Sequence, residues 1–185
     1  MPGRGWGRSS TLLSCALGLI ALVGAARLSG LRLNLTRSLP VGLYRVTQGP
    51  AVRGAIVLVC LPPTLAEVAR ERGYVPHGGS CPGGVMPVGK PVFAVAGDTV
   101  TVTPAGLQVN GVPAVNSKAL ASDRHGRSLP QMSTGRYVVR PGELWLLSEY
   151  SRFSFDSRYF GAVQAAAVRA RVEFLWVPST DGGVR

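Results

Sequence analysis

The chain has 185 residues, a length that fits one ordinary domain and leaves little room for a second. Lysine and arginine together number 20 against 9 acidic residues, so the formal net charge is +11. This excess suggests nucleic acid or an anionic membrane surface as a partner. Hydrophobic residues make up 46% of the chain, which excludes a disordered basic tail, because such tails cannot bury a core. The 24 Gly and 14 Pro indicate many turns, and therefore short strands in preference to long helices.

Near the N-terminus, residues 9–26 form an uncharged, mostly apolar stretch of 18 residues. That length is just sufficient for a helix to cross a hydrocarbon core of about 30 Å. Arginines flank both ends, so the positive-inside rule gives no orientation. We expect a retained transmembrane anchor, or an uncleaved signal, after a short cytoplasmic N-terminus at residues 1–8. Two alternatives stay open: a cleaved secretory signal, with Val23 and Ala25 as small residues near the cleavage point, and a buried helix of a soluble domain.

Three cysteines are compatible with an exported domain. Cys15 lies inside the apolar stretch, where we expect it to behave as an inert small hydrophobic residue. Cys60 and Cys81 lie outside that stretch, and a disulfide between them fits an oxidising compartment. Neither has a second cysteine nearby at metal-ligand spacing, so we expect no metal site, and nothing in the sequence indicates a cofactor.

Apolar or alternating segments bounded by Gly and Pro predict strands along the rest of the chain. They are Gly54–Leu61, Pro91–Gly97, two hairpin arms within Asp98–Val115, Val138–Ser148 and Ala167–Pro178. The Asn110-Gly111 pair between apolar flanks is a strong hairpin signal. Thr64–Gly73 predicts a short helix, with Thr64 as its cap and Glu67 completing a capping box. We therefore expect a mainly β domain with a short helical insertion and, because no helix-turn-helix is visible, no direct nucleic-acid partner.

Histidine-based catalysis has little support, because the chain holds only 2 His. His77 and His125 each lie in a polar segment rich in Gly or Ser, and we interpret both as exposed loop residues.

Lys90 is the stronger candidate for acid–base chemistry. It lies in an apolar segment with no acidic residue before Asp98, and burial there would lower the pKa of its amine toward the range that a general base requires. Of the 20 basic residues, 18 are arginines, which cannot deprotonate, and the other lysine is Lys118. The alternative is an ordinary lysine at a strand edge, with its amine reaching solvent.

Ser38 follows the apolar stretch by about a dozen residues and precedes Leu39 and Pro40. A serine in this setting is often only a turn former. A serine beside a neutral lysine, however, forms a nucleophile–base pair that needs no histidine. The separation of Ser38 and Lys90 along the sequence does not establish that they meet in space.

Four segments in order give that pairing outside support. The apolar N-terminal stretch is followed by SLPVGLY at Ser38–Tyr44, GKPVFAVAGDTV at Gly89–Val100 and SFDSRYFG at Ser154–Gly161. This order resembles the type I signal peptidases. The insertion at Ala69–Gly84 is similar to one branch of that family, the TraF-type peptidases of conjugative transfer systems. The resemblance covers the chain from residue 10 to about residue 178 and implies coiled antiparallel sheets behind one N-terminal transmembrane helix.

The resemblance implies roles for individual residues. Ser38 matches the nucleophile and Lys90 its general base. Thr36 matches the residue whose hydroxyl lines the oxyanion hole, and the backbone N–H of Ser38 would be the second donor. Ser154 matches the hydroxyl that orients the lysine amine.

Asp156 and Arg158 match the acid and the base of the last segment. Asp156 also matches a functionally required position of the TraF branch, although a purely structural salt bridge behind Lys90 is the alternative interpretation. One departure concerns the residues ahead of this segment: leader peptidases usually carry Gly-Asp-Asn-Arg, whereas this chain has Ser148, Glu149, Tyr150 and Ser151. The departure favours the specialised branch.

The resemblance implies a serine endopeptidase, anchored in a bacterial inner membrane, whose domain at residues 27–185 faces the periplasm. Its substrate would be the conjugative pilin precursor, trimmed at the C-terminus and, in some systems, cyclised through an acyl-enzyme. Other components of conjugative transfer by type IV secretion would be further partners. Two alternatives remain: a general type I leader peptidase, and a non-catalytic basic module of a conjugation channel that binds DNA or anionic lipid.

Overall fold

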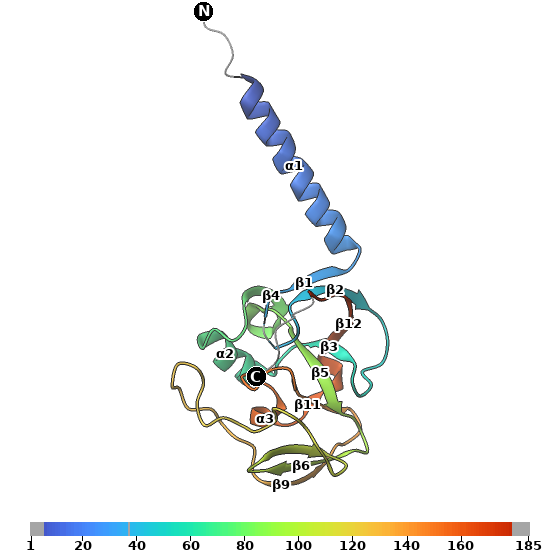
Figure 1. The fold of residues 1–185 in the computed structure, drawn as a ribbon, viewed down its shortest axis with the longest axis vertical. Helices are drawn as coiled ribbons and strands as arrows, with labels where there is room; N and C mark the ends of the chain where they lie inside the picture. Colours follow the sequence, from blue (N-terminus) through green and yellow to red (C-terminus); the bar gives the residue numbers. More distant parts are fainter. Residues whose placement is uncertain (1–5, 37, 179–185) are drawn as a thin grey trace, which may run out of the picture.

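The structure is a computed structural model that describes residues 6–36 and 38–178. Its first helix, α1, spans Trp6–Leu28 and extends away from the rest of the molecule, which is built mainly from strands (Figure 1). In the described part of the chain, no helix meets the length and hydropathy expected of a membrane span. The helix contains the expected anchor at residues 9–26, whose membrane insertion stays a prediction.

The larger sheet begins directly after α1. In the described residues it has the order β1-β2-β12-β3-β5-β10-β11, with every neighbouring pair antiparallel. Its strands are β1 (Leu31–Asn34), β2 (Gly42–Thr47), β3 (Ile56–Val59), β5 (Val88–Ala94), β10 (Glu143–Leu146), β11 (Val163–Gln164) and β12 (Val168–Trp176). This order places β5, the strand that carries Lys90, between β3 and β10, away from either edge of the sheet.

The smaller sheet lies at the end of the body opposite to α1 (Figure 1). Its order within the described residues is β8-β7-β6-β9, and the strands are β6 (Thr99–Thr103), β7 (Gly106–Val109), β8 (Val112–Pro113) and β9 (Gly135–Val138). The predicted hairpin at Asn110-Gly111 is confirmed, because Val109 pairs with Val112 and both turn residues have positive φ, of 51° and 82°. The two sheets share a core that includes Phe93, Val100 and Trp145.

The helical insertion is also confirmed, but its predicted start is wrong. Helix α2 spans Pro63–Glu71 and has Pro62 at its N-cap, with no side-chain capping bond, so the Thr64–Glu67 capping box does not form. The reason is local: Pro63 begins the helix because its fixed φ suits the first helical turn and its missing N–H needs no acceptor. Two buried alanines of α2 join a small core cluster with Cys60 and Cys81.

Cys60 and Cys81 form a disulfide that ties the segment after β3 to the end of β4 (His77–Cys81), which a short 3₁₀ turn, η1 (Pro82–Gly84), follows. His77 therefore begins a strand, and the prediction that it lies in a loop is wrong, although its side chain is exposed as expected. Glycines in β4 masked the alternation that marks a strand in a sequence. His125 is an exposed turn residue, as predicted.

The C-terminal part of the domain returns to the centre of the larger sheet. The short helix α3 (Ser157–Phe160) and the 3₁₀ turn η2 (Ala165–Ala167) precede β12, which pairs with both β2 and β3. The predicted last strand is thus confirmed. Its end is open to solvent, since Phe174 is 45% and Trp176 is 61% exposed.

The disulfide gives a direct chemical prediction. Thiol titration of the unfolded, non-reduced protein should detect Cys15 alone, and titration after reduction should detect all 3 Cys. Because 21 residues separate the bonded cysteines, replacing both with serine should lower the free energy of unfolding by about 3 kcal/mol, as measured by urea denaturation. Three reactive thiols before reduction would contradict the pairing.

Candidate active site

The turn that carries Ser38 is organised by a single side chain. The Asn34 amide Nδ2 donates to the carbonyl oxygens of Thr36 at 3.0 Å, Leu39 at 3.3 Å and Pro40 at 3.0 Å. Its Oδ1 accepts from the backbone N–H of Thr36 at 3.1 Å and from the Thr36 hydroxyl at 2.7 Å. The buried Tyr44 hydroxyl also donates to the carbonyl of Pro40, at 2.6 Å. These bonds hold Thr36 on one side of Ser38 and Leu39 and Pro40 on the other.

The residues next to Ser38 and Lys90 bring the two segments into contact. Leu39 is 5% exposed and packs in a core cluster with Tyr44, so the residue after Ser38 is anchored in the domain. Gly89 lies against it: a Cβ added at Gly89 would lie 3.0 Å from Leu39 Cδ1. A side chain at position 89 would crowd the Leu39 side chain, which would have to give by a few tenths of an ångström, so glycine suits the position immediately before Lys90.

Lys90 is buried at 4% exposure in the middle of β5, opposite Val57 of β3. The alternative of a solvent-reaching lysine at a strand edge is therefore wrong, because β5 has a neighbouring strand on each side. Its Nζ donates a hydrogen bond to the hydroxyl oxygen of Ser154 at 2.6 Å. Ser154, the residue that the resemblance pairs with the lysine, thus contacts the amine directly.

Burial is the main cause of an unusual titration at Lys90. Removal of the amine from water lowers the pKa of Lys90 from 10.5 to about 8, while the charge of Asp156 raises it and that of Arg158 lowers it. A substantial fraction of the amine is therefore neutral in mildly alkaline solution. A neutral amine in a fixed position has the lone pair that a general base needs.

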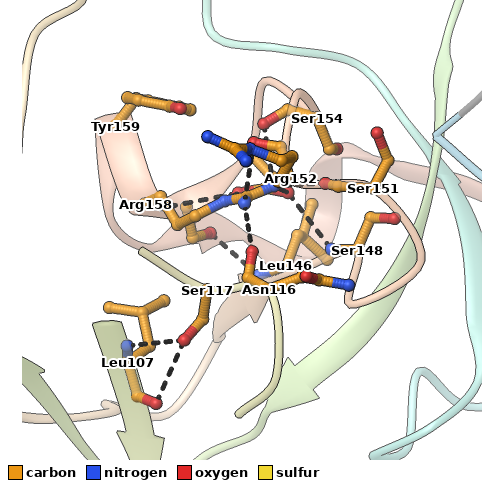
Figure 2. Close-up of polar contacts among 12 residues, drawn as sticks. Leu107, Asn116, Ser117, Leu146, Ser148, Ser151, Arg152, Ser154, Arg158 and Tyr159 are labelled. Atoms are coloured by element: carbon orange, nitrogen blue, oxygen red, sulfur yellow. Dashed lines mark hydrogen bonds and ion pairs between the residues drawn. The ribbon is translucent and has the colours of Figure 1, made fainter. Parts of the chain in front are cut away.

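Asp156 and Arg158 form a buried ion pair behind Lys90. The Arg158 Nε lies 2.8 Å from Asp156 Oδ1, and both side chains are fully buried. The guanidinium also donates to backbone carbonyls of the loop that carries Ser154: those of Ser151 and Ser154 at 3.0 Å and that of Arg152 at 3.2 Å (Figure 2). The ion pair therefore holds the loop from which Ser154 contacts Lys90.

A groove of about 640 Å³ opens beside these residues, and Thr36, Ser38 and Lys90 all line it. Most of its remaining lining is apolar, with Leu58, Val88 and Phe155 among the contributing residues. The sequence-predicted nucleophile, base and oxyanion residue thus share one cavity. Ser154, Asp156 and Arg158 lie behind Lys90 and act on it or on its partner. An extended peptide would fit such a groove with its backbone near Ser38.

Two contributors to this site were missed in the sequence. Asn34 stands two residues before Thr36, a spacing typical of an Asx turn, so local pattern could have revealed it. Ser148 donates its hydroxyl proton to the carbonyl of Ser38 and its backbone N–H to Asp156 Oδ2 at 3.1 Å. Residues 38 and 148 are far apart in the sequence, and no local pattern predicts their contact.

In the described part of the chain, no three His, Cys, Asp or Glu side chains lie close enough together to bind a metal ion. His125 lines the groove but lies in the exposed turn that also holds Asp123.

The burial of Lys90 predicts an effect on stability that is independent of activity. Its folded pKa of about 8 lies below the unfolded value of 10.5, so the unfolded chain binds more protons between these pH values. The free energy of unfolding should therefore rise with pH across this window. Lys90→Met removes the cost of burying an ammonium and should raise the free energy of unfolding by about 3 kcal/mol near neutral pH. Urea denaturation of the wild-type protein and of Lys90→Met at about pH 7 and about pH 10 measures the effect. If the difference between their free energies of unfolding is not smaller at the higher pH, the prediction is contradicted.

Comparison with known proteins identifies the family of the chain. Residues 4–177 match the sequence model of the family described as signal peptidase, peptidase S26. The plasmid transfer protein TraF of Escherichia coli is 41% identical over 150 residues, which cover 80% of this chain and 84% of that protein. The conjugal transfer protein TraF of Agrobacterium tumefaciens (strain 15955) is 41% identical over 156 residues, covering 82% of this chain and 85% of its own.

Among solved structures, a signal peptidase I of Enterococcus faecalis V583 aligns with 67% of this chain and 97% of its own, at 22% identity and a TM-score of 0.36. The family match extends over almost the whole chain, and the TraF proteins cover most of it at about 40% identity. The chain therefore belongs to the S26 family of signal peptidases, and the conjugal transfer proteins TraF are among its relatives.

Proposed function

We propose that this chain is a serine endopeptidase that uses Ser38 as nucleophile and neutral Lys90 as general base to process a conjugative pilin precursor. The observation that carries the proposal is the buried amine of Lys90, which Ser154 orients in the same groove that Ser38 lines. A lysine in this state can accept a proton without help from a histidine. Membership of a peptidase family supplies the reaction class.

In the first step, Lys90 Nζ accepts the proton of the Ser38 hydroxyl as Ser38 Oγ attacks the carbonyl carbon of the scissile peptide bond. The carbonyl oxygen becomes an oxyanion, for which the backbone N–H of Ser38 and the hydroxyl of Thr36 are the proposed donors. In the structure, the Thr36 hydroxyl donates to Asn34 Oδ1. Service as a donor to the oxyanion therefore requires this hydroxyl to turn away from Asn34 when substrate binds.

In the second step, the C–N bond breaks, and the leaving amine takes the proton from the Lys90 ammonium. An acyl-enzyme on Ser38 remains, with Lys90 neutral again. Water then attacks the ester and gives a linear, trimmed product, or the N-terminal amine of the same pilin attacks and gives a cyclic product. In either case Lys90 accepts a proton from the attacking group and returns it to Ser38 Oγ.

The relatives and the sequence support a proposal for the substrate and the location. The TraF relatives are described as plasmid or conjugal transfer proteins, and the resemblance to their branch points to pilin as the substrate. We propose that residues 9–26 anchor the chain in the inner membrane and that the domain from residue 27 faces the periplasm, where a disulfide such as Cys60–Cys81 persists. Other components of the conjugative type IV secretion apparatus are proposed partners.

The mechanism predicts which variants lose activity. Ser38→Ala, Lys90→Ala and Lys90→Arg should each leave the pilin precursor unprocessed, because the first lacks the nucleophile and the other two lack a deprotonatable base. Co-expression with the precursor, followed by mass spectrometry of the pilin, measures the outcome. A product lighter than the linear trimmed chain by one water would identify cyclisation.

The matched control is Lys118→Arg, which changes the exposed lysine outside the groove and should process the precursor normally. Normal maturation by the Ser38 or Lys90 variants would exclude the dyad. Processing of ordinary exported precursors in preference to pilin would instead identify a general leader peptidase.

The titration of Lys90 predicts the pH dependence of the reaction. Because the base must be neutral and its pKa is about 8, kcat/KM should rise about tenfold per pH unit below that value and level off above it. Initial rates on a peptide that spans the cleavage site would measure the profile in the purified, detergent-solubilised full chain. A rate that stays flat from about pH 6 to about pH 9 would show that Lys90 does not supply the base.

A further inference from the structure

Ser148 occupies the first of the four positions at which this chain departs from the Gly-Asp-Asn-Arg of leader peptidases. Ser148 lies two residues after the end of β10, and its side chain is fully buried, with 0% exposure. A serine hydroxyl inside a protein needs hydrogen-bond partners, because an unpaired polar group costs free energy when it is removed from water. The partners of Ser148 therefore indicate why the hydroxyl is tolerated there.

Those partners join Ser148 to the candidate nucleophile and to the buried ion pair. The hydroxyl donates to the backbone carbonyl of Ser38, and the backbone N–H of Ser148 donates to Asp156 Oδ2 at 3.1 Å. A glycine at this position keeps the second bond but cannot form the first. The departure from the leader-peptidase pattern thus creates a hydrogen bond to the nucleophile's own peptide unit.

The same ion pair reaches Lys90 by a second route. Asp156 Oδ2 accepts from Arg158 at 2.8 Å, and Arg158 in turn donates to the carbonyl of Ser154, whose hydroxyl accepts from Lys90 (Figure 2 shows the Arg158 contacts). One buried cluster therefore contacts the backbone of Ser38 on one side and the partner of the Lys90 amine on the other. Ser148 is the connection on the nucleophile side.

We propose that Ser148 is a positioning residue for the reaction: its hydroxyl fixes the peptide unit that follows Ser38 and so keeps the nucleophile aligned with Lys90. The inference rests on the proposed Ser38–Lys90 dyad. Asn34 holds the two ends of the same turn, at Thr36 and Pro40, whereas Ser148 bonds Ser38 itself. Without that bond, the peptide unit of Ser38 can rotate, and the fraction of molecules in the reactive alignment falls.

The test compares two buried serines in the purified full chain. Ser148→Ala should lower kcat for the pilin precursor by about 10- to 100-fold, with KM within about twofold of the wild-type value, because substrate binding does not use this hydroxyl. The pH midpoint should stay near 8, since Lys90 remains buried and bonded to Ser154. Rates are normalised to the folded fraction, measured by circular dichroism.

The matched control is Ser117→Ala, which removes a hydroxyl of similar burial that bonds only Leu107 and Ala114 among the contacts described. It should leave kcat unchanged per folded molecule. Should Ser148→Ala not fold, Ser148→Gly removes the same hydroxyl at a position where leader peptidases carry glycine. A kcat within about twofold of wild type in the folded Ser148 variant, or an equal loss in Ser117→Ala, would overturn the proposal.

Failure of the dyad itself would be recognised separately. Ser38→Ala and Lys90→Ala are measured in the same assay, and activity in either variant would refute the proposed function whatever Ser148→Ala does. Inactive dyad variants beside a fully active Ser148→Ala would refute only the role of Ser148.

Discussion

An amine that is shut off from water must be neutral or must be matched by nearby charge, because desolvation penalises the ammonium form. Lys90 has charges of both signs nearby, and they oppose each other: Asp156 raises its pKa and Arg158 lowers it. Since these two residues also neutralise each other, burial decides the direction of the shift. Lys90 lies on β5, between β3 and β10 in the sheet, and it is 4% exposed, so the amine meets the first of these conditions only when it is neutral.

The ion pair that balances Lys90 is itself expensive to bury unless its hydrogen-bonding capacity is used. Arg158 meets this condition by bonding Asp156 and several backbone carbonyls, including that of Asn116 at 2.6 Å. Asp156 also caps the short helix α3, where its side chain accepts from the N–H of Arg158. The Asp156–Arg158 pair can therefore be a structural salt bridge and also contribute to the site, because the loop that it holds carries Ser154, the partner of Lys90.

The local parts of this structure were predictable and the long-range parts were not. The Asn110-Gly111 hairpin and strands β3, β6, β7, β10 and β12 depend on neighbouring residues and were predicted correctly, whereas β1, β2 and β4 were not predicted and β5 begins at Val88, ahead of the predicted Pro91. The start of α2 was missed because Pro63 prevailed over a capping pattern that is equally local. Lys90 was identified by its apolar surroundings, but its partner Ser154 needed a family resemblance, since 64 residues separate them. The contact between Ser148 and Ser38 had no sequence signal, because it depends on how β10 and the turn before β2 pack together.

The site shows why it matters that nearly all basic residues of this chain are arginines and only two are lysines. A guanidinium keeps its charge in every environment, so the buried Arg158 can serve as a permanent cation beside Lys90 but can never act as a base. Burial lowers the pKa of an amine, so a buried lysine can become a neutral base near pH 8, which a guanidinium cannot. The two lysines occupy opposite environments: Lys118 is exposed and Lys90 is buried. The net charge of +11 is a property of the arginines. The capacity to accept a proton within the groove depends on one lysine that the fold keeps dry.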